Sequence, residues 1–201
     1  MVHHPIAART ARLRLDPLTS ADAADLLGVY GNPDTWRHMP EGRFTDIDMA
    51  LANIAKSEHS HREYGLGTWA IRIDAAGSDA SLPEGTFIGT GGVRYLKDAG
   101  VWNLGYRLDP RSWGRGFATE VALAAIKEAA AIAPRAPVTG RALANNSASL
   151  AVLEKVGLTL IWEGYTADAP RPATGSEPPL RRLYSDRELT PSAHNWLIAH
   201  A

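Results

Sequence analysis

The sequence contains no cysteine among its 201 residues. Disulfide bridges, thiolate zinc sites, iron–sulfur clusters and a cysteine nucleophile are therefore excluded. An excess of charge of one sign is also missing, because 21 basic and 22 acidic residues give a formal net charge of -1. Without a basic excess or an acidic block, the composition indicates neither nucleic-acid binding nor an acidic tail.

Long apolar runs are absent as well. No segment reaches the roughly 18–20 apolar residues of a membrane-spanning helix. The N-terminal residues Met1 to Pro5 do not begin the apolar core of a signal peptide. We therefore expect a cytoplasmic protein with no membrane partner.

The remaining composition is typical of a globular protein, with 45% hydrophobic and 21% charged residues. The length fits a single domain spanning residues 1–201, with a core from about residue 10 to residue 188. Alternating apolar residues predict strands, expected at 10–18, 69–73, 86–96, 101–109, 138–144, 158–162 and 182–184. Helical spacing and caps predict helices, expected at 20–30, 46–61, 116–133 and 147–155. The segment 167–179 is rich in proline and is expected to be a loop, and the order of elements predicts an α/β fold with a mixed sheet.

The most informative segment is the turn between the strand that ends near Leu108 and the long helix that follows. It contains Gly114 and Gly116, and it runs directly into the helix. A helix N-terminus offers unpaired N–H groups and a partial positive charge, and glycine allows a pyrophosphate to approach closely. The same turn also occurs as a plain connection between a strand and a helix. It is neither a dinucleotide fingerprint, since Thr119 stands at the third glycine's place, nor a P-loop, since the Gly-Lys-Ser/Thr sequence is missing.

Two segments carry a resemblance to a known family. The pattern formed by Leu108, Pro110, Trp113, Gly114, Gly116 and Ala118 resembles motif A of the GNAT (GCN5-related N-acetyltransferase) superfamily. The segments 145–149 and 152–158 together are similar to its motif B. The early segment 32–40 resembles the branch that contains the ribosomal-protein alanine and serine N-terminal acetyltransferases, and the matches span about residues 10–185. The resemblance implies a mixed, mostly antiparallel sheet with a splayed central strand pair, flanked by helices.

The resemblance also implies an activity, the transfer of an acetyl group from acetyl-CoA to a primary amine, by direct attack in a ternary complex that leaves CoA. The Leu108 N–H would act as the oxyanion donor, and Ser149 would be the general acid. Asn146 would hydrogen-bond the cofactor arm. Ser149 could equally be a plain helix residue, and Asn146 could also be a helix N-cap. The implied cofactor-binding residues are Leu108, Trp113, Gly114, Arg115, Gly116, Phe117, Ala118, Thr119, Asn146 and Ser149.

One departure from the family concerns the general base. Asn103 stands where related enzymes often have glutamate, and an amide cannot accept the proton of an amine at neutral pH. A water chain, a carboxylate such as Glu41, or lost catalysis would each explain this. Lost catalysis gives the alternative of a non-catalytic acyl-CoA-binding or sensor protein, and a structural domain without a cofactor is a further alternative.

The acceptor is a protein N-terminus or a small-molecule amine, and the protein is a monomer or a homodimer. The resemblance suggests that Trp36, His38, Asn103, Tyr165 and Arg182 line the acceptor pocket. No metal is expected, because His59 and His61 are two residues apart on a predicted helix and face away from each other.

Overall fold

The computed structural model describes residues 6–37, 40–165 and 180–200. The predicted loop at 167–179 and His38 both lie outside these residues. The strands are β1 (Ala8–Arg9), β2 (Leu13–Pro17), β3 (Thr68–Ile73), β4 (Phe87–Leu96), β5 (Val101–Leu108), β6 (Val138–Leu143), β7 (Thr159–Gly164) and β8 (Arg181–Ser185). The helices are α1 (Ala23–Gly31), α2 (Pro33–Trp36), α3 (Ile47–Tyr64), α4 (Phe117–Ile132), α5 (Ser147–Lys155) and α6 (Pro191–Ala199).

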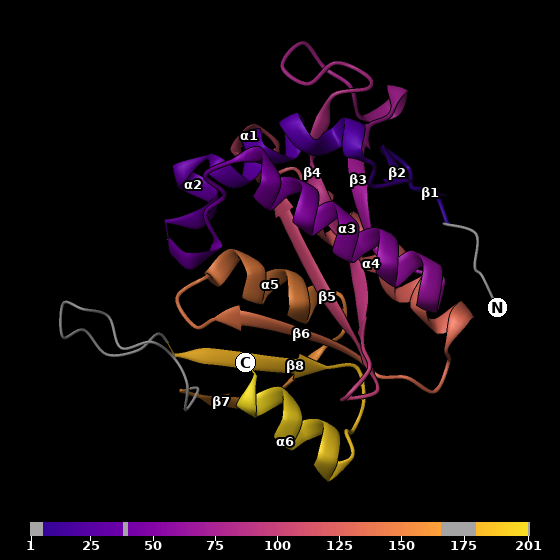
Figure 1. Ribbon diagram of the computed structural model, residues 1–201, viewed down its shortest axis with the longest axis vertical. Helices are drawn as coiled ribbons and strands as arrows, with labels where there is room; N and C mark the ends of the chain where they lie inside the picture. Colours follow the sequence, from indigo (N-terminus) through magenta and orange to yellow (C-terminus); the bar gives the residue numbers. More distant parts are fainter. Residues whose placement is uncertain (1–5, 38–39, 166–179, 201) are drawn as a thin grey trace.

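These strands form one mixed sheet in the order β1-β2-β3-β4-β5-β6-β8-β7. Every neighbouring pair is antiparallel except β5 and β6, which run parallel. Their pairing covers only Trp102–Leu104 against Val138–Gly140, although β5 continues to Leu108 and β6 to Leu143. Figure 1 shows the two strands diverging from this region, with α5 drawn between them. The predicted mixed sheet with a splayed central pair is confirmed.

Helices cover both faces of the sheet. In Figure 1, α3 crosses in front of β3 and β4, and α4 lies behind the sheet. The α4 face is tightly packed at Gly91 of β4, where an added Cβ would lie 2.7 Å from Cγ1 of Val121 in α4. The absence of a side chain at Gly91 therefore lets α4 lie close to the strand that precedes β5.

Three elements of the fold were missed by the sequence analysis, namely β1, the four-residue helix α2 and α6. The short β1 is too brief to give a pattern, and α6 follows the last predicted strand. The signal for α6 is present in retrospect: the Thr190 hydroxyl accepts a hydrogen bond from the Ala193 amide, and Pro191 occupies the first helical position. Leu197 of α6 is fully buried and packs with Leu183 of β8.

Among the described residues, no helix is both long enough and apolar enough to cross a membrane.

Candidate functional site

The turn between β5 and α4 has the backbone that the sequence analysis expected. Gly114 (φ 74°) and Gly116 (φ 79°) both adopt the left-handed conformation, which L side chains rarely take. A Cβ on Gly114 would meet no atom within 4 Å. Gly116 is the N-cap of α4 and has no side chain with which to cap the first amides. The turn therefore leaves the positive end of a 16-residue helix open to an anion.

Arg12, which the sequence analysis did not single out, holds this turn in place. Its Nη2 lies 2.7 Å from Oε2 of Glu120 in α4, and its Nη1 donates to the Arg115 carbonyl at 3.0 Å. Its guanidinium also lies over the Phe117 ring, 4.6 Å from the centroid. Burial opposes ionisation of Glu120, but hydrogen bonds from Thr10 and Arg12 lower the pKa of its carboxyl. The carboxylate thus ties the first turn of α4 to the segment before β2.

The two large side chains of the turn are both engaged by the protein. Trp113 is half exposed, and its Nε1 donates to the Leu108 carbonyl at 2.9 Å. The Arg115 guanidinium forms an ion pair with Asp79 and donates to the Ser81 hydroxyl at 2.8 Å. Hydrogen bonds from Ser81 and Arg115 hold the pKa of Asp79 well below its usual range. The Arg115 side chain is therefore bound to the loop between β3 and β4.

The remaining residues predicted to bind the cofactor at this turn form the first turn of α4. Phe117 is buried, whereas Ala118 and Thr119 are partly buried. The buried Phe117 ring packs in the core and under Arg12, so its contribution to an anion site is its backbone amide.

The backbone of Leu108 is oriented toward the gap between β5 and β6. Leu108 pairs with Gly89 of β4, and the next amide, that of Asp109, donates to the Ile88 carbonyl at 2.8 Å. Hydrogen-bonded and non-hydrogen-bonded positions alternate in an antiparallel pair. The Leu108 N–H consequently points away from β4, toward the side from which β6 has diverged.

Tyr106 connects the two sides of this gap. Its hydroxyl donates to the Ser149 carbonyl at 3.2 Å, which links β5 to α5. Burial raises the pKa of Tyr106 to about 12. Asn146 is the N-cap of α5, since its side-chain oxygen accepts from the Ser149 amide at 3.1 Å. The Asn146 cap and the Tyr106 hydrogen bond thus link Ser149 to β5, and Tyr106 is a hydroxyl that the sequence analysis overlooked.

Asn103 is the middle residue of the three in β5 that pair with β6. It pairs with Arg94 of β4 and with Thr139 of β6. Its Oδ1 is buried and has no hydrogen-bond partner among the described residues. A buried amide oxygen of this kind usually has a donor, so a further group is expected to reach it.

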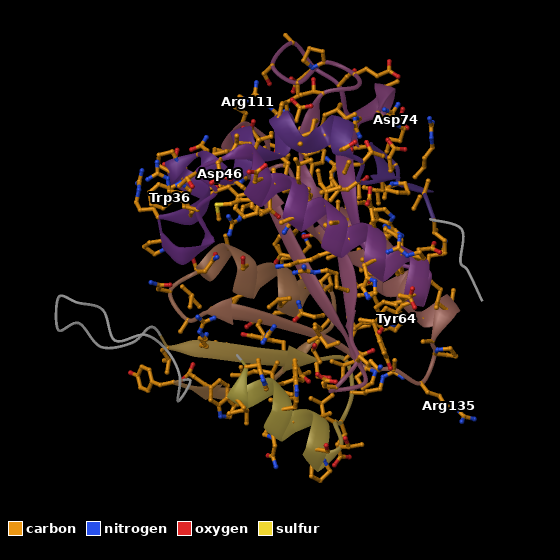
Figure 2. The ribbon with its side chains drawn as sticks, viewed as in Figure 1. Trp36, Asp46, Tyr64, Asp74, Arg111 and Arg135 are labelled. Atoms are coloured by element: carbon orange, nitrogen blue, oxygen red, sulfur yellow. The ribbon has the colours of Figure 1, made fainter. Side chains whose placement is uncertain are left out.

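The other residues predicted for the acceptor are dispersed. The Trp36 indole donates to the Gly31 carbonyl at 3.0 Å and lies under Arg43, and Figure 2 shows it at the outer edge of α2. Tyr165 is half exposed just beyond the end of β7. Arg182 is ion-paired with Glu163.

Glu41 lies in a short 3-10 helix, η2 (Pro40–Gly42), and its side chain is outside the described part of the structure. The neighbouring Gly42 carbonyl accepts a hydrogen bond from Nη1 of Arg107 at 2.6 Å. This contact places η2 beside the C-terminal end of β5.

A hollow of about 450 Å³ lies elsewhere, between the β4–β5 turn and the end of α4, and is lined by Tyr95, Gly100 and residues 133–136. It lies at the opposite end of both β5 and α4 from the glycine turn, so it is not part of this site.

Comparison with known proteins agrees with the geometry. The family model described as an acetyltransferase (GNAT) domain matches residues 12–159. YkkB of Bacillus subtilis (strain 168), an uncharacterized protein, is 25% identical over 162 residues, which are 74% of this chain and 83% of that protein.

Solved structures share the fold. An acetyltransferase from Agrobacterium tumefaciens str. C58 superposes with a TM-score of 0.69 at 24% identity, covering 94% of this chain and 98% of that one. RimL, a ribosomal L7/L12 alpha-N-protein acetyltransferase solved with coenzyme A, gives a TM-score of 0.67 at 15% identity, covering 92% and 98%.

Proposed function

Because the chain belongs to the GNAT acetyltransferase family, we propose that it transfers an acetyl group from acetyl-CoA to a primary amine. The observation that carries the proposal is the open N-terminus of α4, which follows a glycine turn at the end of β5, beside the gap between β5 and β6. We also propose that the whole chain acts as one catalytic domain.

The residues of the turn fit the pyrophosphate of CoA. Gly114 and Gly116 leave space for close approach, and the first amides of α4 point at the site that an anion would occupy. The side chains of Trp113 and Arg115 are already engaged, so the pyrophosphate would be held mainly by backbone N–H groups. Coenzyme A bound to RimL, which shares this fold, supports the same assignment.

The gap between β5 and β6 fits the arm that leads to the thioester. Bound acetyl-CoA supplies an acyl group that is activated by its thiol leaving group. The Leu108 N–H, which points into the gap, would donate to the thioester carbonyl oxygen. Preorganised donors of this kind are worth about 3–4 kcal/mol in related hydrolytic enzymes.

A proton must reach the leaving thiolate, and we assign this acid role to the Ser149 hydroxyl. The Tyr106 hydroxyl donates to the Ser149 carbonyl and so helps to hold this part of α5 beside β5. Burial raises the pKa of Tyr106 to about 12, which makes its hydroxyl a weaker acid than a free tyrosine. Tyr106 would therefore position Ser149.

The base that accepts the amine proton is either an ordered water or Glu41. Asn103 cannot take this role, because an amide is not a base at neutral pH. The hydrogen bond from Arg107 of β5 to the Gly42 carbonyl supports Glu41 as the carboxylate, because it brings the backbone of η2 beside that end of the strand. RimL, which acts on a protein N-terminus, supports a protein N-terminus as one class of acceptor, and small amines form the other.

The test is release of the CoA thiol from acetyl-CoA in the presence of a panel of primary amines, with a reaction without amine as the control. The proposal predicts release that depends on both protein and amine. Tight binding of acetyl-CoA with no amine-dependent thiol release would instead support the alternative of an acyl-CoA sensor. Asn103, at the position where related enzymes often have glutamate, favours that alternative.

A further inference from the structure

Three arginines on neighbouring strands share one face of the sheet with Asn103. Arg94 of β4 pairs with Asn103 of β5, which in turn pairs with Thr139 of β6. Cross-strand partners lie on the same face of a sheet, so these three residues form a row across the strands. The row crosses the point where β5 and β6 begin to diverge.

The other two arginines continue this face. Arg141 is two residues beyond Thr139 on β6, and Leu143 is two residues further on. Leu143 pairs with Arg181 of β8. Since side chains two apart on a strand point to the same side, Arg141 and Arg181 join Arg94 on one face.

This face is the one that α4 and α5 leave uncovered. Gly140 lies between Thr139 and Arg141 and faces the opposite way, where an added Cβ would lie 2.5 Å from Leu153 of α5. An acceptor that approaches the gap from the α5 side would meet that helix. The other face carries Asn103 and the three arginines. Helix α6 packs on part of that face against Leu183, which lies on the same side of β8 as Arg181, so the acceptor would enter beside α6.

Among the described residues, the three guanidinium groups have no carboxylate to balance them. No ion pair joins Arg94, Arg141 or Arg181 to an acidic residue in the described part of the chain. Nε of Arg181 is buried without a hydrogen-bond partner there, as is Oδ1 of Asn103. Arg141 donates to the carbonyl of His200, after the end of α6.

The three charges also act on one another. Burial lowers the pKa of Arg141, and the charges of Arg181 and Arg94 lower it further. Like charges at close range and buried donors without acceptors both cost stability. Such an arrangement is typical of a site that an anion completes.

We propose that the amine acceptor carries an anionic group, a carboxylate or a phosphate, that binds among Arg94, Arg141 and Arg181 while its amine reaches into the gap between β5 and β6. The inference rests on the proposed function, because it takes this face as the acceptor side of an acetyltransferase. Arginine suits both anions, since its planar guanidinium can bind either in a bidentate manner. A cationic acceptor such as a polyamine would be repelled at the same place.

The test compares acceptors that differ in the anion, with each rate divided by the fraction of neutral amine at the assay pH. L-amino acids are paired with the corresponding L-amino acid amides, and O-phosphoethanolamine is paired with ethanolamine. Two readouts are used: CoA thiol release from acetyl-CoA, and calorimetric binding of each amine to the protein saturated with CoA. In at least one of the two kinds of pair, we expect the anionic amine to show at least tenfold higher kcat/KM and tighter binding than its uncharged counterpart. The kind of pair with the larger difference identifies the anion as a carboxylate or a phosphate.

The variants are Arg181→Gln and Arg94→Gln, with Arg135→Gln as the matched control. Arg135 is exposed beyond the end of α4, and Figure 2 shows it at the periphery of the molecule. We expect R181Q and R94Q to reduce the preference for the anionic amine at least tenfold, mainly through KM, with CoA affinity unchanged. Because they relieve repulsion, their Tm should stay the same or rise, whereas residues with only a structural role would lower it.

The outcomes separate the inference from the proposed function. Acetylation of amides and ethanolamine as fast as their anionic partners, or an undiminished preference in R181Q and R94Q, would overturn the anion site and leave the transferase. Arginine-dependent binding of anionic amines without any thiol release would support the anion site and overturn the transferase. Neither selective binding nor thiol release would overturn both.

Discussion

A single charge placed at Gly114 tests the position of the cofactor phosphates. Gly114 is exposed at φ 74°, and its Cβ would enter open space. Aspartate and asparagine tolerate this backbone better than other non-glycine residues and have the same size. Gly114→Asp and Gly114→Asn therefore impose nearly the same conformational cost and differ in charge.

The size of the effect follows from Coulomb's law. A carboxylate about 5 Å from one pyrophosphate charge is repelled by about 1 kcal/mol in water and about 3 kcal/mol at the effective dielectric of a protein surface. We therefore expect G114D to bind CoA about 5- to 150-fold more weakly than G114N. The difference should shrink in ~1 M salt, where screening reaches only ~3 Å.

The assay is calorimetric titration of both variants with CoA, after their melting temperatures show that both are folded. CoA affinities of G114D and G114N that both equal the wild-type affinity at low salt would refute the placement of the pyrophosphate at this turn. A loss of affinity in both variants alike would instead show that the backbone conformation, and not the charge, controls binding.

Three further predictions concern side chains in and around the site. Ser149→Ala should lower the kcat of acetyl transfer more than the affinity for CoA, and adding Tyr106→Phe to S149A should lower kcat little further, because Tyr106 acts through Ser149. Equal losses of kcat and CoA affinity in S149A would make Ser149 a positioning residue. Glu120→Gln should lower the free energy of unfolding by about 1–3 kcal/mol in a denaturant titration, because Arg12 loses its charged acceptor; an unchanged midpoint would contradict that role. His61 is buried, and burial lowers its pKa, so the unfolded chain binds a proton at His61 more readily than the folded chain does. Stability should therefore fall as the pH drops below about 6.5. His61→Phe should weaken this dependence of Tm on pH in melting experiments from pH 7 to 5, and an unchanged dependence would show that other groups cause it.

Much of the fold was predictable because local patterns and tertiary packing agree. The long helix that begins after Gly116, the strand that ends at Leu108 and the short helix capped by Asn146 were all expected near their observed bounds. The glycine turn was predictable for the same reason, since its conformation depends on residues within the turn itself.

The parts that were missed depend on contacts between distant segments. Arg12 reaches Glu120 across more than one hundred residues, and the three arginines lie on three different strands. Their shared face follows from strand register, which the sequence pattern did not supply. Tyr106 was read as part of a motif, and only the packing of α5 against β5 brings its hydroxyl to Ser149.

The most direct test of the account is thermal unfolding with acetyl-CoA, with CoA and with NADH. A ligand at about 100 times its dissociation constant stabilises the folded state by about 2.7 kcal/mol, which for a chain of this length raises Tm by about 5–11 °C. The account predicts this shift with acetyl-CoA and CoA and none with NADH. No shift with either CoA species, or an equal shift with NADH, would contradict a CoA site at the glycine turn.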